Sequence, residues 1–219
     1  MLDENVRKFY ESVQTGVVTD AMYLLGLEGW MTDVFPLRPE KRIFGKAFTV
    51  QAVRIREKGE PNYTIYDLSE KWEAGDILVV DAFGENCSLM GENIAHTCMY
   101  GGLNGVVLNG RCRDFGQISE LEMPVFGKGP AMELKNKRFK YGMYQVTLAN
   151  MAGAQVRPGD YILGDVDGVL VIPSDRLEDI MYQAEMIIEV ENEMEDAIRN
   201  RCSVAEVKAI ASKKKKARA

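Results

Sequence analysis

Histidine and cysteine are scarce in this chain of 219 residues, and their scarcity limits the kinds of site that it can build. It holds one histidine, His96, and four cysteines without the CxxC spacing of redox or zinc sites. A zinc site with the usual nitrogen and sulfur ligands is therefore excluded. The cysteines also lack the density of a disulfide scaffold, so we expect them to be reduced and mostly buried.

Long apolar runs are absent as well. No stretch approaches the roughly 20 apolar residues that a membrane-spanning helix needs. The first ten residues, MLDENVRKFY, lack the basic start and the apolar centre of a signal peptide. We therefore expect a cytoplasmic protein that has no membrane partner.

Positive charge is concentrated at the C-terminus, where residues 212–219 (SKKKKARA) contain five of the 27 basic residues. The net charge of the whole chain is -6, so the remaining sequence is more acidic still. An acidic body repels phosphate backbones, which argues against nucleic acid as a partner. A terminal block of like charges is usually solvated, so we expect residues 212–219 to form a disordered tail.

The residues that are present predict one α/β domain over residues 1–211. With 46% hydrophobic residues the chain can bury a sizeable core, and no stretch rich in Pro, Ser or Gly separates two halves. The apolar runs 77–80 (ILVV) and 105–108 (GVVL) do not alternate with polar residues. This pattern is typical of strands that are buried on both faces of a layered sheet.

The spacing of apolar residues predicts two helices near the N-terminus and a long helix near the C-terminus. The second N-terminal helix is expected to start at Thr19 or Asp20, either of which can cap it, and to stop near Gly26. The long helix is expected to run from a cap at Ser174 to about Asn200, with one apolar face and one acidic face.

Two segments, residues 75–84 and 159–168, share the pattern G-D-x4-D-x2-G. In both, a Gly-Asp pair precedes an apolar run, and the later aspartate and glycine follow it. The pattern predicts two related strands within one core rather than a repeat protein. Asp165 and Asp167 could also suggest a calcium loop. The apolar run GVLVIP follows at once, however, so we interpret them as turn residues.

The stretch from Gly91 to Asp114, GENIAHTCMYGGLNGVVLNGRCRD, contains the candidate site. A glycine and a carboxylate open a predicted helix, a buried strand ends at Asn109, and a charged cluster that includes Arg111 and Arg113 follows. Ligands of α/β sheets gather beyond the carboxyl ends of strands, so a site is expected here. Taken alone, the Arg-Asp pair is more simply explained as an exposed arginine beside a carboxylate that caps the next helix.

Around this stretch the sequence resembles the RraA-like family, which includes the class II 4-hydroxy-4-methyl-2-oxoglutarate aldolases and the regulators of ribonuclease E activity. The central match is Gly91–Glu92, a helix, a Gly-Val-Val strand and Arg113–Asp114. Supporting matches are Thr19-Asp20-Ala21, GKAFTV, GDILVVD, PVFGKG and PGDYILGDVDGVLVIP. Two positions differ, because Gln117 stands where many members are acidic and Glu92 stands where aspartate is usual.

The resemblance implies a layered α/β/β/α sandwich of the swivelling β/β/α type, with a long C-terminal helix. It also implies that Asp114 binds a divalent metal, Mg²⁺ or Mn²⁺, and that Arg113 holds the carboxylate and the enolate oxygen of a 2-oxo acid substrate. Glu92 would order a water molecule that acts as a base. Magnesium agrees with the residues present, because it prefers oxygen ligands and needs few of them from the protein.

The remaining implied contacts come from the start of the helix and from a neighbouring subunit. Gly91, Asn93 and Ile94, together with Glu92, would present backbone amides to the substrate. Glu193 or Glu195 of another subunit would approach the metal. A shared site of this kind implies a homotrimer or a hexamer.

The predicted activity is cleavage of a 4-hydroxy-2-oxo acid with release of pyruvate, or decarboxylation of oxaloacetate, each through an enolate that a cation stabilises. The alternative is a non-catalytic regulator that binds a protein partner such as a ribonuclease, because one fold can host both roles. Arg113, Asp114 and the acid at position 92 favour the enzyme, whereas Gln117 argues against it. The sequence does not identify the 2-oxo acid.

Overall fold

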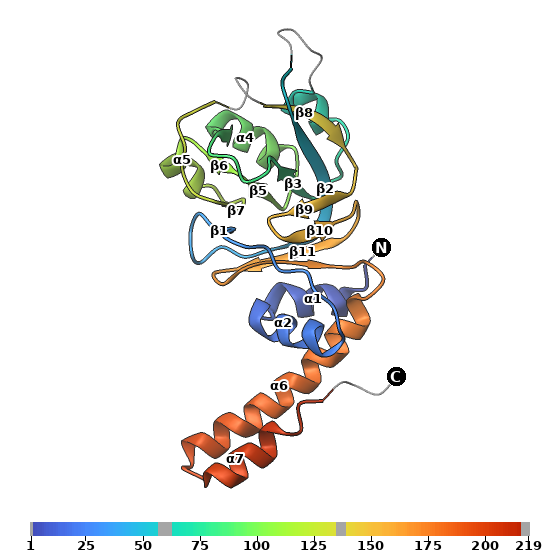
Figure 1. The fold of residues 1–219 in the computed structure, drawn as a ribbon, viewed down its shortest axis with the longest axis vertical. Coiled ribbons are helices and arrows are strands. Elements are labelled where there is room, and N and C mark those ends of the chain that lie inside the picture. Colours follow the sequence, from blue (N-terminus) through green and yellow to red (C-terminus); the bar gives the residue numbers. More distant parts are fainter. Residues whose placement is uncertain (1, 57–62, 135–138, 216–219) are drawn as a thin grey trace. The chain divides into compact units, whose positions relative to one another are not determined.

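The computed structural model describes residues 2–56, 63–134 and 139–215 (Figure 1). The chain divides into two compact units. Gly29–Ser174 form the first, which holds every strand of the described residues and which we call the sheet unit. Met1–Glu28 and Asp175–Ala219 form the second, which we call the helical unit. Within the described ranges, no helix has the length and apolar character that crossing a bilayer requires.

The sheet unit contains, in chain order, β1 (Phe35–Pro36), β2 (Ile43–Arg54), α3 (Ile65–Ser69), β3 (Ile77–Asp81), β4 (Ser88–Met90), α4 (Glu92–Tyr100), β5 (Gly105–Asn109), β6 (Arg111–Cys112), α5 (Phe115–Ser119), β7 (Val125–Gly127), β8 (Phe139–Tyr144), β9 (Leu148–Met151), β10 (Ala154–Val156), β11 (Tyr161–Asp165) and β12 (Gly168–Ile172). The helical unit contains α1 (Glu4–Ser12), α2 (Thr15–Leu24), α6 (Leu177–Arg199) and α7 (Val204–Ala211).

One large mixed sheet forms the frame of the sheet unit. Its strand order is β1-β7-β5-β3-β2-β11-β12, and β8 also pairs with β2. The central strands β2, β3, β5 and β7 are parallel, so their carboxyl ends lie at one edge of the sheet. β3 and β5 are buried along their whole length, as their unbroken apolar runs predict.

Apolar clusters cover both faces of the parallel strands, because successive side chains point to opposite faces. Val106 and Leu108 of β5 belong to the cluster that includes side chains of α3, α4 and α5. Val107, between them, belongs to the cluster to which β9, β10, β11 and β12 contribute. Figure 1 shows the helices α4 and α5 on one side of the central strands. The α/β class predicted from the sequence is confirmed, and this unit has α/β/β layers.

The two G-D-x4-D-x2-G segments build matching turns around β3 and β11. Asp76 and Asp160 each accept a hydrogen bond from the backbone amide three residues earlier, at 3.0 and 2.8 Å. Asp81 and Asp165 each accept one from the amide two residues later, at 2.9 and 3.0 Å. All four side chains are buried. The amide that bonds to Asp165 is that of Asp167, so the interpretation of Asp165 and Asp167 as turn residues is confirmed.

The helical unit is built on α6, against which α1, α2 and α7 pack. Tyr10 of α1 is fully buried, and its hydroxyl donates to the carbonyl of Leu177 at 2.8 Å. Burial raises the pKa of Tyr10 far above its ordinary value, so the hydroxyl keeps its proton and remains a donor. The contact joins the first helix of the chain to the start of the long helix.

Two predicted helix starts are wrong. The long helix α6 begins at Leu177 after Arg176, not after a cap at Ser174. The helix α2 begins at Thr15, four residues before the predicted cap at Thr19. The hydroxyl of Thr19 instead donates to the carbonyl of Thr15, 2.9 Å away within the helix. Thr15 is itself buried, so packing of this turn outweighs the local capping preference of Thr19.

The structure describes the predicted basic tail as far as residue 215. Lys213 forms an ion pair with Glu193 at 2.5 Å, and Lys214 forms one with Glu191 at 2.6 Å. Such partly exposed pairs contribute little to stability, typically about 0–1 kcal/mol. Residues 216–219 lie outside the described part of the chain, and the disorder expected there stays a prediction.

Candidate functional site

The candidate site forms where β4 and β6 lie side by side as a short parallel pair. Their register places Met90 opposite Cys112, and the amide of Arg113 donates to the carbonyl of Met90 at 3.0 Å. Because the two strands end at the same level, Gly91 enters α4 next to Arg113. This pairing brings together the two ends of the stretch from Gly91 to Asp114.

Gly91 allows the start of α4 to lie in close contact with the Arg-Asp pair. A Cβ atom at this position would lie 2.7 Å from Oδ2 of Asp114 and 3.0 Å from Nε of Arg113. Contacts this short would force the pair to move. The backbone of Gly91 is extended, with φ -125°, so a larger residue is disfavoured here by the contact with Asp114 and Arg113 and not by the backbone conformation.

Asp114 has a left-handed backbone conformation, with φ 54° and ψ 37°. This conformation costs most residues about 1–2 kcal/mol, and Asp and Asn tolerate it best among side chains with a Cβ atom. The carboxylate does not cap α5, which follows it; its Oδ2 accepts the amide of Glu92 at the start of α4, at 3.0 Å. Nε of Arg113 lies 3.6 Å from the same oxygen. The simple interpretation of Asp114 as the cap of the next helix is therefore wrong.

The acidic groups of the site keep unused acceptors. The side chains of Arg113 and Asp114 are 41% and 37% exposed. In the part of the chain that the structure describes, Oδ1 of Asp114 and the carboxylate of Glu92 have no hydrogen-bond or ion-pair partner. Both carboxylates are therefore available to a ligand.

Backbone amides at the start of α4 are available too. The first bond within this helix runs from the amide of Ala95 to the carbonyl of Gly91, at 3.0 Å. The amides of Asn93 and Ile94 precede it and belong to the first turn, where no carbonyl of the helix can reach them. Since Asp114 takes the amide of Glu92, these two amides are the ones left for an anion.

A pocket of about 190 Å³ opens beside these groups. It is lined by Ser88, Leu89, Met90, Gly91, Ile94, Arg113 and Leu134. Pockets for drug-sized ligands usually span about 300–1,000 Å³, so this one suits a smaller molecule. Two hydrogen bonds hold its β4 wall: the Tyr141 hydroxyl donates to the carbonyl of Leu89 at 3.0 Å, and the Ser88 hydroxyl donates to that of Met90 at 2.9 Å.

The donor set fits a hard divalent cation. Mg²⁺ is often bound through one or two carboxylates, with water and substrate oxygens completing its shell. Asp114 offers one free carboxylate oxygen. The residue whose amide bonds to its other oxygen is Glu92, which carries a second carboxylate. Across the described residues, no group of three or more His, Cys, Asp or Glu side chains could hold a metal ion. One subunit therefore offers one or two carboxylate ligands at this site.

The acidic residues predicted to come from a second subunit lie on α6 of the helical unit. Glu193 is paired with Lys213, and Glu195 is paired with Arg199 at 2.6 Å. Both glutamates are partly exposed, so a ligand could compete for them. Their approach to a neighbouring site, and the homotrimer or hexamer that it implies, stay predictions.

The cysteines and the histidine add no reactive group to the site. All four cysteines are free, and three of them are buried, as expected. Burial raises the pKa of Cys98 to about 12. Burial and the negative charge of Asp114 raise the pKa of Cys112 to about 11, so neither thiol ionises near neutral pH. The ring of His96 lies near that of Tyr100, with centroids 5.8 Å apart.

A second pocket, of about 430 Å³, lies beside Arg111, which belongs to the charged cluster that follows β5. Arg111 and Lys128 line it, and the amide of Lys128 donates to the carbonyl of Gly110 at 2.9 Å. Lys128 lies in the PVFGKG match, where no function was expected of it. Both cations follow a glycine, Gly110 or Gly127, at the end of a buried parallel strand, and this shared pattern could have identified them.

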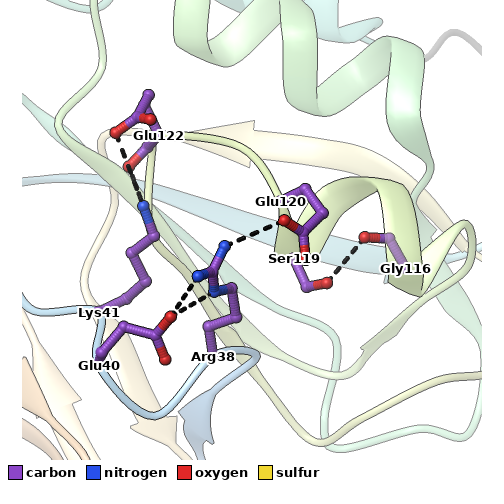
Figure 2. Close-up of polar contacts among 7 residues, drawn as sticks. All are labelled: Arg38, Glu40, Lys41, Gly116, Ser119, Glu120 and Glu122. Carbon is purple, nitrogen blue, oxygen red and sulfur yellow. Dashed lines mark hydrogen bonds and ion pairs between the residues drawn. The ribbon is translucent and has the colours of Figure 1, made fainter.

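Polar contacts connect two walls of the second pocket, the segment after β1 and the α5 region (Figure 2). Nε of Arg38 donates to Glu40 at 2.6 Å, and Nη1 of Arg38 donates to Glu120 at 3.2 Å. Nζ of Lys41 donates to the carbonyl of Glu122 at 3.1 Å. A backbone hydrogen bond and the Arg38 guanidinium hold the pKa of Glu40 below its usual value. Each contact is exposed and weak, but together they link the two segments.

Comparisons with known proteins agree with this fold. A family model described as RraA-like, Aldolase/RraA, matches residues 15–171. Protein DlpA of Legionella pneumophila is 30% identical over 182 residues, which cover 83% of this chain, and the match spans 29% of DlpA. A 4-hydroxy-4-methyl-2-oxoglutarate aldolase of Thermus thermophilus is 30% identical over 156 residues, which cover 67% of this chain and 94% of that protein.

A solved structure shows the same fold. It is RraAS2 of Streptomyces coelicolor, described as an unusual member of the RNase ES inhibitor RraA protein family. The two structures superpose with a TM-score of 0.80 at 24% sequence identity, over 92% of this chain and 100% of that one.

Proposed function

Because this chain belongs to the RraA-like family, we propose that it is a divalent-metal-dependent lyase that breaks a carbon–carbon bond of a 2-oxo acid. A 4-hydroxy-2-oxo acid would give pyruvate and a second carbonyl compound, and oxaloacetate would lose CO2 through the same enolate. The observation that carries the proposal is the Asp114 carboxylate, which keeps a free oxygen beside Arg113 at the start of α4. The name of the Thermus thermophilus relative supports an aldolase.

The start of α4 would bind the acid group of the substrate. Amides in the first turn of a helix point toward a ligand, and the helix dipole favours negative charge there. Asn93 and Ile94 supply such amides, and Arg113 adds a planar donor that can bind a carboxylate through two hydrogen bonds. The volume of about 190 Å³ would favour a short substrate.

Asp114 would hold the divalent cation through its free Oδ1, with Glu92 as the nearest further carboxylate at this helix start. When bound, the cation would act as a Lewis acid toward the 2-oxo group. The Arg113 guanidinium would offset the negative charge that grows on the enolate oxygen as the C3–C4 bond breaks. Glu92 would take the proton of the 4-hydroxyl group through an ordered water molecule, and the enolate of pyruvate would then be protonated at C3.

The regulator alternative predicts a different outcome for the same residues. RraAS2 is described within a family of ribonuclease inhibitors, and a shared fold does not separate a catalyst from a binding protein. A regulator that only binds a partner would not need the free carboxylate oxygens beside Arg113. Turnover by variants of these residues therefore distinguishes the two functions.

The test is a screen of 2-oxo acids with the wild type, Arg113→Ala and Asp114→Asn, in which pyruvate release is measured with Mg²⁺ or Mn²⁺. Arg157→Ala is the matched control, because Arg157 is an exposed arginine of the same unit outside both pockets. We expect both site variants to lose activity and the control to keep it, with folding checked by circular dichroism. Equal rates in all four proteins would refute the lyase, and release that survives complete chelation would refute the role of the metal.

A further inference from the structure

We propose that the second pocket, at Arg111 and Lys128, binds a small organic anion whose charged head is attached to an apolar body. This pocket and the Gly91–Arg113 pocket share no lining residue. The site is therefore additional to the one assigned to the lyase, and its ligand does not depend on that assignment.

Two cations, Arg111 and Lys128, line the pocket, and their hydrogen bonds run to backbone carbonyls. Nη1 of Arg111 donates to the carbonyl of Lys128 at 2.6 Å, and Nζ of Lys128 donates to the carbonyl of Thr32 at 3.0 Å. These acceptors are neutral. With the residues that the structure describes, neither Arg111 nor Lys128 forms an ion pair, although Asp33 lines the same pocket. Both positive charges therefore remain available to an anion.

The guanidinium of Arg111 also has more N–H donors than the structure provides with acceptors. Its Nε is buried and has no hydrogen-bond partner among residues 2–56, 63–134 and 139–215. Buried donors are rarely left unpaired, because an unmade hydrogen bond is costly. Gly129, with φ 95°, lies close by, and a Cβ atom there would be 3.5 Å from Nη1 of Arg111. The guanidinium is thus positioned by one carbonyl and retains donors, as recognition of a carboxylate or phosphate requires.

The position and the other walls of the pocket indicate the rest of the ligand. Arg111 and Lys128 follow the carboxyl ends of the parallel strands β5 and β7, at the edge where α/β sheets bind ligands. The apolar walls include Phe35, which is 49% exposed, and Phe115. A volume of about 430 Å³ is within the range of small-molecule sites. Cations beside the exposed ring of Phe35 and the partly buried ring of Phe115 fit an anion that carries an aliphatic or aromatic group.

The proposal can be tested by isothermal titration calorimetry of the intact protein without added metal. Four probes compare a carboxylate with a phosphate, each with and without a phenyl group: acetate, phenylacetate, inorganic phosphate and phenyl phosphate. We expect saturable binding in which each phenyl compound binds more tightly than its small counterpart, and the two heads show which anion is preferred. Lys128→Gln and Arg111→Gln should each weaken binding about 10-fold or more, because each removes a charged donor.

Two controls locate the bound anion. Lys71→Gln removes an exposed cation elsewhere in the sheet unit, and Arg113→Ala removes the cation of the first pocket; both should leave the affinity unchanged. If Arg111→Gln fails to fold, Lys128→Gln carries the test, because the ammonium group of Lys128 is exposed.

The absence of saturable binding to the wild type by any probe would overturn the proposal. Equal affinity in the wild type and Lys128→Gln would do the same, as would loss of binding in Arg113→Ala. Since the measurement uses no turnover, a failed lyase assay would not affect its result.

Discussion

Aspartates occupy two kinds of turn in this protein, and the contrast shows how a structural carboxylate differs from a candidate functional one. Asp76, Asp81, Asp160 and Asp165, around β3 and β11, are between 3% and 7% exposed and accept nearby backbone amides. Asp114 is 37% exposed, accepts an amide from a different helix and keeps one oxygen free. A buried carboxylate that accepts nearby backbone amides stabilises a turn. An exposed carboxylate with an unused oxygen can still bind a ligand.

The largest expected effect comes from the partner of the exposed aspartate. Arg113→Ala should lower turnover about 100-fold to 1000-fold, because a preorganised donor to the enolate oxygen is lost. Arg113→Lys should do little better, since an ammonium group cannot reproduce the planar fork. Steady-state kinetics of pyruvate release measure both, with Arg157→Ala as the control. A change in KM with kcat intact would show that Arg113 binds the substrate without stabilising the transition state.

Gly91→Ala tests whether the close approach at Asp114 matters. The new Cβ atom would lie 2.7 Å from Oδ2 of Asp114, so the carboxylate and Arg113 would have to shift. A misplacement of about 1 Å can cost about 100-fold in rate, and we expect a loss of that order. Gly116→Ala is the control, because a Cβ atom there meets nothing within 4 Å. Similar rates for the two variants would contradict the proposed geometry.

Asp114→Asn separates the charge of this residue from its turn. Asn tolerates the left-handed conformation, and its side-chain oxygen can still accept the amide of Glu92, so the free energy of unfolding should change little. Without the carboxylate, the concentration of Mg²⁺ needed for half-maximal activity should rise at least about 10-fold. Titration of activity with Mg²⁺ and urea denaturation measure the two quantities. A large loss of stability with unchanged metal dependence would place Asp114 with the structural aspartates.

Asp81→Ala should lower stability without affecting turnover, the opposite of what we expect for Asp114→Asn. Asp81 accepts the amide of Phe83 at 2.9 Å and the side chain of Asn109 at 2.7 Å, so its loss leaves buried donors unpaired. We expect the free energy of unfolding to fall by about 1–3 kcal/mol, with turnover per folded molecule unchanged. Urea denaturation with parallel kinetics tests this. A loss of turnover without a loss of stability would end the contrast between the two kinds of turn.

The smallest expected effect is a pH dependence at Asp76. Burial raises the pKa of Asp76 above its ordinary 3.8, although the hydrogen bond from the Glu73 amide opposes the shift. The folded state therefore favours the protonated acid. The contribution of Asp76 to stability is greatest below the unfolded pKa and is lost as pH rises through the raised folded value. Asp76→Asn should remove this loss of stability with rising pH. Asp175→Asn, at an exposed aspartate, should leave it in place. Urea denaturation from about pH 4 to 7 provides the comparison.

Patterns within a single element were the most predictable part of the fold. The apolar runs 77–80 and 105–108 predicted buried strands, because no polar residue interrupts either run, and β3 and β5 are buried. Helix starts were predicted less well. Many residues can cap a helix as Thr19 can, and the packing of Thr15 and its neighbours decided where α2 begins. Capping preferences alone do not contain that information.

The resemblance to a family selected the residues of the first site, and the structure brings Gly91 to Ile94 together with Arg113 and Asp114. Two features could not be predicted from the sequence. The β4–β6 pair is too short to show a periodic pattern, and the left-handed Asp114 bonds to Glu92 of α4, 22 residues away in the sequence. The second pocket also depends on β1, which pairs with β7 from a distant part of the chain.

The outermost strand next to β7 has a consequence for association between chains. β1 has two residues, and one of them is Pro36, which has no amide hydrogen to donate. An open edge of a sheet invites strand pairing with other molecules, and a short strand that contains proline blocks it. On this side, the sheet is therefore protected against edge-to-edge aggregation. Any assembly of several copies would have to use helices, loops or sheet faces instead of an extension of the sheet at β1.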